Sequence, residues 1–357
     1  MSVYQQMQAP WVVLFRPDLH EELQRLAFEI DGRSIVPELK LGAKIVSVDI
    51  ESATITLEDG MKYTADLVVG ADGENSIVRT AEGLNGTSIV RESPFKIFRC
   101  MIPTKEFEED EVLRPYLEQK RHSLTAYTDG IKILTWWGCR GGEMQDLEAS
   151  YLRRDSTGFL KGGFTASPIL RQDFLTWENL DYKEGCFSEA LLSEYKGFHP
   201  ILGRALSKAK QVSSWDINFS TPPLCWTKGK AVLIGDAVHS MFPTTGQGAC
   251  QCLEDAAALG VFLGNLSSQA DLSVRLQMFQ VFRRQRVIPV HATSGILLGQ
   301  ESGMDEKRAR LLPGGKPFSG PLETLEFTNA YDVIAEGRRH LEECSTEHAV
   351  FHIPSAL

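Results

Sequence analysis

The fold of this chain is decided by one stretch, Lys228-Gly-Lys-Ala-Val-Leu-Ile-Gly-Asp-Ala-Val-His-Ser-Met-Phe-Pro-Thr-Thr-Gly-Gln-Gly-Ala-Cys-Gln-Cys-Leu-Glu-Asp255. It contains a short apolar run, Ala231 to Ile234, next to a glycine turn, and this pattern predicts a buried strand. Gly235 and Asp236 follow the run, so a carboxylate stands where the backbone leaves the sheet. Ligands of open α/β sheets bind in the crevice at this end of the strands. The stretch therefore predicts a ligand site beside Asp236.

The second half of the stretch predicts a glycine-lined helix start. Pro243 stiffens the loop, and Gly246 and Gly248 remove side chains just before a helical pattern that includes Ala249. Unpaired N–H groups at a helix start attract anionic or carbonyl oxygens, and glycine lets a ligand come close to them. The loop is thus suited to hold a polar cofactor.

The order of residues in this stretch resembles the second flavin-binding motif of the single-component FAD-dependent aromatic monooxygenases, the salicylate and p-hydroxybenzoate hydroxylase family. The resemblance is carried by Gly235-Asp236-Ala237, His239, Pro243, Gly246-Gln247-Gly248 and Glu254-Asp255. It implies that Asp236 binds the ribityl chain of FAD. It also implies that the helix start, with Gly246, Gly248 and Ala249, faces the pyrimidine edge of the flavin ring. A generic strand-turn-helix explains one Gly-Asp pair but not the whole series.

A second resemblance lies near the beginning of the chain. Residues 11–15 predict a strand, and Pro17-Asp18 opens a predicted helix with Arg16 at the junction. In the resembled family an arginine at the start of such a helix contacts FAD, so Arg16 is a predicted cofactor residue. The alternative is a local ion pair with an acidic neighbour.

A third resemblance lies in Gly70-Ala-Asp-Gly-Glu-Asn-Ser-Ile-Val-Arg79, which follows a predicted strand. It is similar to the family's Asp-Gly motif, which lies near the cofactor pyrophosphate and is linked to nicotinamide cofactor use. The resemblance implies that Asp72 helps to bind the cofactor. The alternative is an ordinary strand-to-helix turn with Ser76 near a helix N-cap.

The sequence contains no Gly-x-Gly-x-x-Gly, the motif with which members of the family begin. That motif seats the ADP pyrophosphate within a βαβ unit of roughly thirty residues or more, and Arg16 lies too near Met1 for such a unit to precede it. Relative to the family, the N-terminal unit is missing. The expected fold class is therefore α/β (α+β mixed), an incomplete Rossmann-like FAD-binding domain with an inserted β-sheet substrate domain.

Four parts are expected along the chain. They are the first part of the FAD-binding domain (residues 1–93), a substrate-binding sheet domain (94–227), the second part of the FAD-binding domain (228–302) and an irregular C-terminal segment with a helix (303–357). Strands are predicted at 45–50, 54–57, 63–69, 95–102, 123–127 and 131–137, with a hairpin turn at Asp59-Gly60. Helical segments at 189–208 are interrupted near His199-Pro200.

Two residues of the sheet domain are candidates for substrate binding. Arg99 lies in an otherwise apolar strand, and Tyr127 lies in the next predicted strand that could face it. Related fungal hydroxylases hold a phenolate with an arginine and a tyrosine, and a cation beside the phenol oxygen favours its ionised form. The alternative is that both are packing residues. Farther along, Arg283 and Arg286 lie on one face of a predicted helix, for which a solvated basic face is the expected role.

Composition excludes several classes of protein. The net charge of −10 and the pI near 5.4 make nucleic acid and anionic membranes poor partners. The seven cysteines form no CxxC pair and favour reduced thiols in a cytoplasmic chain, and no apolar run has the length of a membrane span. His348 and His352 lack a third ligand, so no metal is expected. Neither a Gly-x-Ser-x-Gly elbow nor a Walker loop is present.

The resemblance implies an FAD-dependent monooxygenase of the fungal secondary-metabolism type. Such an enzyme uses NAD(P)H as co-substrate and molecular oxygen to hydroxylate a small phenolic or polyketide-derived aromatic. The alternative is a catalytically silent flavoprotein remnant or an accessory binding protein. The sequence leaves the exact substrate, the choice of NADH or NADPH, and the oligomeric state open.

Overall fold

The computed structural model describes residues 12–29, 35–81, 84, 90–121, 123–152, 186–266, 268–295 and 304–346. The chain divides into two compact units. The first comprises the described parts of Lys40–Arg91 and Asn218–Leu357, and the second those of Trp11–Leu39 and Glu92–Ile217. Residues 12–29 and 35–39 group with the sheet unit in this division.

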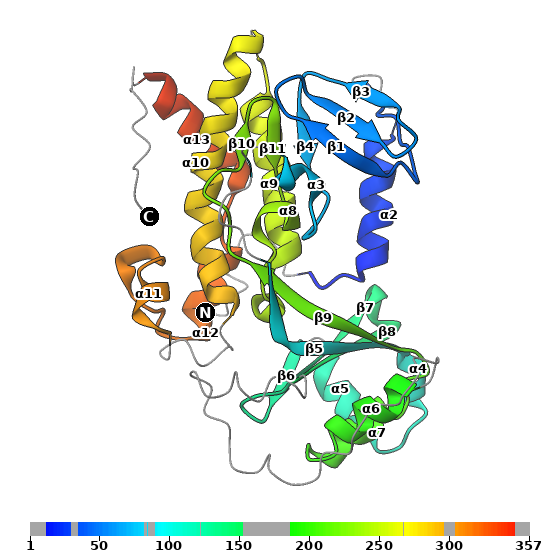
Figure 1. Ribbon diagram of the computed structural model, residues 1–357. Coiled ribbons are helices and arrows are strands. Elements are labelled where there is room, and N and C mark those ends of the chain that lie inside the picture. The colour runs from blue at the N-terminus through cyan, green and yellow to red at the C-terminus, as the bar shows by residue number, and fades with distance from the viewer. Residues whose placement is uncertain are drawn as a thin grey trace. The chain divides into compact units, whose positions relative to one another are not determined.

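Two small sheets lie in the described part of the first unit (Figure 1). One is the antiparallel meander β1 (Ile45–Asp49), β2 (Thr54–Leu57) and β3 (Lys62–Thr64), with the predicted turn at Asp59-Gly60 between β2 and β3. The other has the order β10-β11-β4, formed by β10 (Thr227–Lys228), β11 (Ala231–Leu233) and β4 (Val68–Gly70). β11 runs parallel to β4 and antiparallel to β10.

The continuous apolar run of β11 is explained by two cores on its two faces. Ala231 and Leu233 pack in one core with Trp226, and Val232 packs in another with Phe262 and other residues of the helices. A strand buried on both faces is apolar at every position, as parallel strands in covered sheets usually are. This is why the sequence pattern identified the strand correctly.

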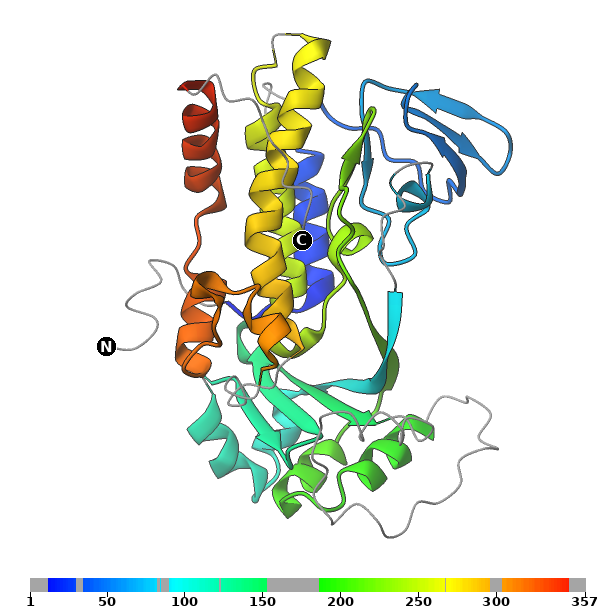
Figure 2. The ribbon, with the colours of Figure 1, turned by 60° about the vertical axis from the view of Figure 1, so that its left-hand side comes forward.

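Helices cover this core and extend to the end of the described chain (Figures 1 and 2). The short ones are α3 (Ile77–Thr80), α8 (Asp236–His239), the 3₁₀ turns η4 (Pro243–Thr245) and η6 (Pro313–Gly315), α11 (Glu306–Ala309) and α12 (Pro321–Asn329). The long ones are α9 (Gln247–Leu263), α10 (Gln269–Ser294) and α13 (Val333–Thr346), and α9 contacts both α10 and α13.

The second unit is built on a five-stranded antiparallel sheet of order β6-β7-β8-β5-β9. The strands are β5 (Val90–Pro103), β6 (Thr125–Thr128), β7 (Ile133–Cys139), β8 (Met144–Leu152) and β9 (Val212–Ser220). The chain crosses between the units within β5 and β9. The predicted strands at 95–102, 123–127 and 131–137 are confirmed, with shifts of a few residues at their ends.

One face of this sheet carries the core of the second unit. Phe98, Leu134 and Leu147 lie there with residues of α4 (Thr104–Glu108), α5 (Leu113–Lys120), α6 (Cys186–Glu194) and α7 (Pro200–Leu206). Figure 2 shows α5, α6 and α7 together on this side of the sheet. The predicted break near His199-Pro200 is confirmed, because α7 begins at Pro200 with His199 as its N-cap.

The beginning of the second unit differs from the prediction. Residues 12–15 form no strand, whereas the predicted helix is present as α2 (Arg16–Ala27), with Pro17 in its first turn. No residue of α2 is buried, and the Leu23 and Leu26 side chains are exposed. The apolar run predicted a strand, but none of residues 12–15 is buried, and no described strand pairs with them.

Gly70 provides a test of the packing between β4, β11 and α3. A Cβ atom at this position would lie 2.7 Å from Val78 Cβ and 2.8 Å from Leu233 Cδ2, both in the core. Gly70→Ala is therefore expected to lower the free energy of unfolding by about 1–3 kcal/mol through overpacking. Urea unfolding followed by circular dichroism measures the change.

Gly260 is the matched control for Gly70. It lies exposed in α9, with nothing within 4 Å of an added Cβ. Gly260→Ala is expected to stabilise the protein by about 0.5–1 kcal/mol, because alanine costs less conformational entropy in a helix. Equal effects of the two substitutions on the free energy of unfolding would contradict the close packing of Val78 and Leu233 against Gly70.

Candidate functional site

Asp236 lies at the end of β11, as the first residue of α8. The turn before it depends on Gly235, whose φ of 61° and ψ of −146° suit only glycine. Asp236 is exposed, and within the described chain no hydrogen bond or ion pair of its carboxylate is seen. The prediction of a carboxylate presented at the strand end is therefore matched by the geometry.

The start of α9 is the second part of the site. Gly246 adopts the left-handed conformation (φ 66°), and no side chain caps the helix. A Cβ at Gly248 would meet only Met241 Cγ, at 3.9 Å, so the protein itself leaves room for a side chain there. Ala249 is exposed. The first turn thus presents uncapped N–H groups beside a position kept bare, which suits a ligand that brings oxygen atoms.

A buried carboxylate, Asp255 in α9, fixes the turn that carries Asp236. Its Oδ2 accepts hydrogen bonds from the Gly235 N–H (2.8 Å) and from His239 Nε2 (2.6 Å). Its Oδ1 accepts one from Arg283 Nε (2.7 Å). Burial disfavours the charged form of Asp255, but His239 and Arg283 outweigh that effect and hold its pKa below the ordinary value. Asp255 is therefore an ionised anchor between α9, α10 and the Asp236 turn.

The prediction that Arg283 and Arg286 form a solvated basic face is wrong. The Arg283 side chain is 0% exposed, and that of Arg286 is 4% exposed. Arg283 Nη1 donates to Glu254 Oε2 in α9 (2.7 Å). Arg286 Nη2 donates to the Thr328 carbonyl in α12 (2.9 Å). The two arginines instead join α10 to α9 and α12. The acidic pair Glu254-Asp255 was the sequence signal that could have revealed their partners.

The Asp72 carboxylate is hydrogen-bonded at the start of α3. Its Oδ1 accepts a hydrogen bond from Ser76 Oγ (2.6 Å) and its Oδ2 from the Ile77 N–H (2.7 Å). Ser76 is the N-cap of α3, as the alternative reading expected, and accepts from the Arg79 N–H. A role of Asp72 toward the cofactor remains a prediction, and its carboxylate already has partners within this turn.

Arg79, which sequence reasoning gave no separate role, joins this turn to α8. It is 8% exposed and donates through Nη1 to the Ala237 carbonyl (2.6 Å) and through Nη2 to the Glu74 carbonyl. The segment 70–79 and the Asp236 turn are therefore held together by a buried guanidinium. The two segments, far apart in sequence, therefore lie together within the first unit.

Arg16 belongs to the second unit, where it begins α2. The neighbouring Asp18 accepts from Arg140 Nε (2.8 Å), and the Arg140 guanidinium lies 4.6 Å from the centre of the Phe15 ring. These contacts attach the helix start to η1 (Arg140–Gly142) after β7. A contact between Arg16 and FAD remains a prediction.

The expectation that Arg99 and Tyr127 face each other is wrong. Their strands, β5 and β6, are separated in the sheet by β8 and β7. The register aligns Tyr127 with Leu134, Ala149 and Phe98 on the core face, and aligns Arg99 with Glu148, Thr135 and Ala126 on the other. Since residues of one register row share a face, the two side chains lie on opposite sides. The two strands follow each other in the sequence, which suggested that they pair, but the strand order places β7 and β8 between them.

Their partners confirm this separation. The Tyr127 hydroxyl is hydrogen-bonded to the Tyr116 hydroxyl, and burial, with Tyr116, raises the pKa of Tyr127 above its ordinary value. Arg99 Nη2 donates to Asp146 Oδ2 (2.6 Å), and its Nε lies 3.4 Å from Glu148 Oε1. Arg99 therefore already faces two carboxylates.

The described residues offer neither a metal site nor a membrane-spanning helix. They contain no group of three or more His, Cys, Asp and Glu side chains that could hold a metal ion. In the same part of the chain, no helix has the length and apolar character needed to cross a membrane. His348 and His352 lie outside the described residues.

A family model and several known proteins resemble this chain. Residues 203–288 match the FAD binding domain family, a segment that contains Asp236, all of α9 and most of α10. The FAD-dependent monooxygenase phomE' of Diaporthe leptostromiformis is 29% identical over 338 residues, which are 93% of this chain and 79% of that protein. Hispidin-3-hydroxylase of Neonothopanus nambi is 26% identical over 93% of this chain and 74% of its own length.

The fold has a counterpart among solved structures. A salicylate hydroxylase in complex with its substrate superposes with a TM-score of 0.64 at 22% identity, covering 91% of this chain and 75% of that one. The mixed α/β fold is thus the fold of FAD-binding monooxygenases. The resemblance to FAD-dependent monooxygenases and hydroxylases is confirmed, and the comparisons support an enzyme of this class.

Proposed function

We propose that the first unit binds FAD through Asp236 and the start of α9. The observation that carries the proposal is the exposed Asp236 carboxylate on a turn anchored by buried Asp255, beside an uncapped helix start with glycine at position 248. A carboxylate is a strong acceptor for ribityl hydroxyls, and uncapped N–H groups suit the carbonyl oxygens of a flavin ring. Gly246, Gly248 and Ala249 would line that edge. Asp72 would assist.

The reaction proposed is hydroxylation of a phenolic or polyketide-derived aromatic, with NAD(P)H as reductant and molecular oxygen as oxidant. A bound flavin supplies the redox chemistry, while the protein positions the substrate and excludes water. The anchored turn is suited to this task because rigid, buried hydrogen bonds fix the ligand-binding residues before the ligand arrives. Secondary metabolism is the proposed setting, as the resemblance of the sequence implies.

The proposal is tested by adding FAD to the purified full chain and then NADH or NADPH under anaerobic conditions. Uptake of FAD, with an oxidised-flavin absorbance band, followed by bleaching of that band by one of the two nicotinamides, is the expected result. Hydroxylated product should then appear when oxygen and a phenol are supplied. Protein that takes up no FAD would refute the proposal and favour a catalytically silent remnant.

A further inference from the structure

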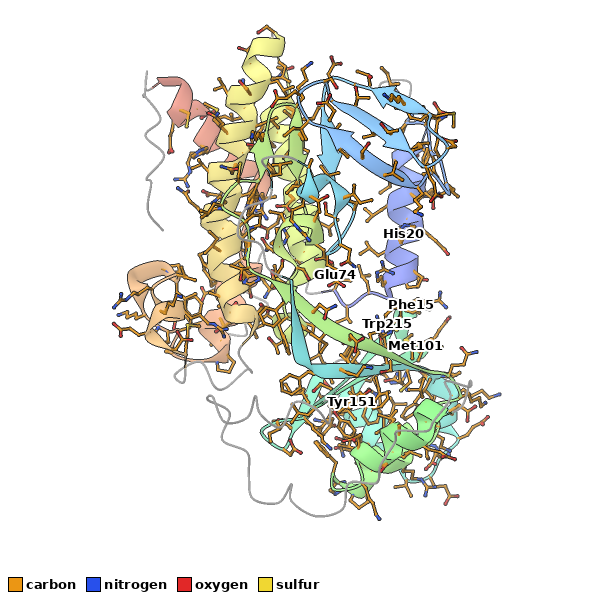
Figure 3. The ribbon with its side chains drawn as sticks, in the orientation of Figure 1. Phe15, His20, Glu74, Met101, Tyr151 and Trp215 are labelled. Atoms are coloured by element: carbon orange, nitrogen blue, oxygen red, sulfur yellow. The ribbon has the colours of Figure 1, made fainter. Side chains whose placement is uncertain are left out.

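One face of the second unit's sheet carries charged side chains beside tryptophan. Its members are Arg99, Trp137, Asp146, Glu148 and Trp215, which we call the polar face. The register aligns Arg99 with Glu148, and Trp137 with Asp146, on neighbouring strands. Figure 3 labels Trp215 and Met101, and Met101 pairs with Asp146 in the sheet register. It also labels Tyr151, whose ring stacks on Phe98 on the opposite, core face.

Three polar atoms of this face are buried without a hydrogen-bond partner among the described residues. They are Arg99 Nε, Trp137 Nε1 and Asp146 Oδ1. Buried polar atoms without partners cost free energy, and native proteins satisfy nearly all of them. The set comprises two donors and one acceptor. A hydroxyl group donates one hydrogen bond and accepts two, whereas a carboxylate only accepts.

The polar face carries more carboxylates than cations. Two carboxylates, Asp146 and Glu148, face the single guanidinium of Arg99, at 2.6 Å and 3.4 Å. Arg99 and Glu148 are about a quarter exposed (27% and 26%), whereas the Asp146 side chain is 0% exposed. The positive charge is therefore already balanced, and a second negative charge comes from Glu148. An anionic ligand would meet net repulsion here.

Other titratable groups along this face do not change the balance. Cys139 is the next residue of β7 after Trp137 on the polar face, and its side chain is buried. Burial raises its pKa to about 11, so the thiol carries no charge at neutral pH. Arg140 is neutralised by Asp18. Burial likewise raises the pKa of Glu148 to about 7 and the pKa of Asp146 above its ordinary value, although Arg99 opposes both rises. Both carboxylates therefore carry their full charge only at a pH above about 7.

We infer that the polar face binds the hydroxyl groups of an uncharged phenol and that Glu148 excludes aromatic carboxylates. This inference rests on the proposed function, which it narrows to one class of substrate. Exposed Trp215, on β9 beside β5, adds an aromatic surface on the same side, because the preceding Ser214 is hydrogen-bonded to Tyr151 of the core face (3.1 Å) and side chains alternate along a strand. Aromatic side chains hold ring ligands through stacking.

The test compares two phenols of nearly the same shape, the neutral 3-hydroxybenzamide and the anionic 3-hydroxybenzoate. Their binding to the full chain saturated with FAD is measured by calorimetry and by quenching of tryptophan fluorescence. The amide is expected to bind at least about tenfold more tightly than the benzoate at pH 8. Benzoate affinity should rise as the pH falls from 8 to 6, because Glu148 takes up a proton. Amide affinity should stay constant, since phenols titrate near pH 10 and carboxylic acids near 4.

Glu148→Gln is expected to raise benzoate affinity about tenfold, to leave amide affinity within about threefold, and to remove the pH dependence. Glu148→Asp keeps the charge and should keep the preference. Glu143→Gln, which removes an exposed carboxylate just before β8, is the control for net charge and should change neither affinity.

Three results would overturn the inference: equal affinity for the two probes, tighter binding of the benzoate, or no binding of the amide. Failure of the proposed function is recognised separately, because protein that takes up no FAD lacks the flavin absorbance band. The titration of tryptophan fluorescence, to which Trp137 and Trp215 contribute among the six tryptophans of the chain, can still be carried out in that case.

Discussion

Replacing Asp236 by alanine is expected to weaken FAD binding by roughly 10- to 150-fold, the range for a hydrogen bond to a charged group. Asp236 is exposed at the end of β11, and within the described residues no contact of the chain depends on its carboxylate. Its loss should therefore affect the ligand and not the fold. Titration of FAD, followed by quenching of flavin fluorescence, measures the change, and thermal unfolding of the apoprotein should be nearly unchanged.

Two further variants show whether the effect belongs to this carboxylate. Asp236→Asn keeps one acceptor oxygen without the charge and should lie between the parent and the alanine variant. Glu326→Ala removes another exposed carboxylate of the same unit, in α12, and should leave FAD affinity unchanged. If Asp236→Ala bound FAD as tightly as its parent, the proposed flavin site would be abandoned.

Asp255→Ala is expected to lower the free energy of unfolding by about 3–5 kcal/mol, because it leaves a buried guanidinium without its partner. Asp255 is the shared acceptor for Gly235, His239 and Arg283, and the side chains of Asp255, His239 and Arg283 are 0% exposed. The Asp236 turn loses its anchor in the same variant, so FAD affinity should fall as well. Urea unfolding and FAD titration measure the two effects.

Glu254→Gln is the matched comparison for Asp255. Glu254 also pairs with Arg283, but its side chain is 14% exposed and it does not contact the Asp236 turn. A smaller loss of stability and little change in FAD affinity are expected. A loss below about 1 kcal/mol for Asp255→Ala would show that the buried network is not the anchor.

The pH dependence follows from the same residue. The pKa of Asp255 is below its ordinary value, because His239 and Arg283 outweigh the effect of burial. A carboxyl group with a lowered pKa in the folded state contributes stability that is present above its ordinary pKa and is lost as the pH falls. The parent should therefore lose more stability on acidification than Asp255→Asn, whose side chain does not titrate.

Local patterns were sufficient for the elements of the site. The apolar run before Gly235-Asp236, the glycines before α9 and the hairpin signal at Asp59-Gly60 each predicted the element observed. Such signals act within a few residues, through backbone conformation and through the alternation of buried positions. The same rules failed for residues 12–15, whose apolar side chains stay exposed or half-buried in a segment that pairs with no described strand.

The sequence by itself determined the class of the protein and the place of Asp236, because a long motif fixes a strand, a turn and a helix start together. Only the tertiary structure decided which charges are buried. It paired Arg283 with the acidic residues of α9, and it placed Arg99 and Tyr127 on opposite faces of one sheet. Strand order and helix packing bring together residues far apart in the chain, and no local pattern records those distances. The polar face, with Glu148 beside Arg99, therefore became visible only in the folded chain.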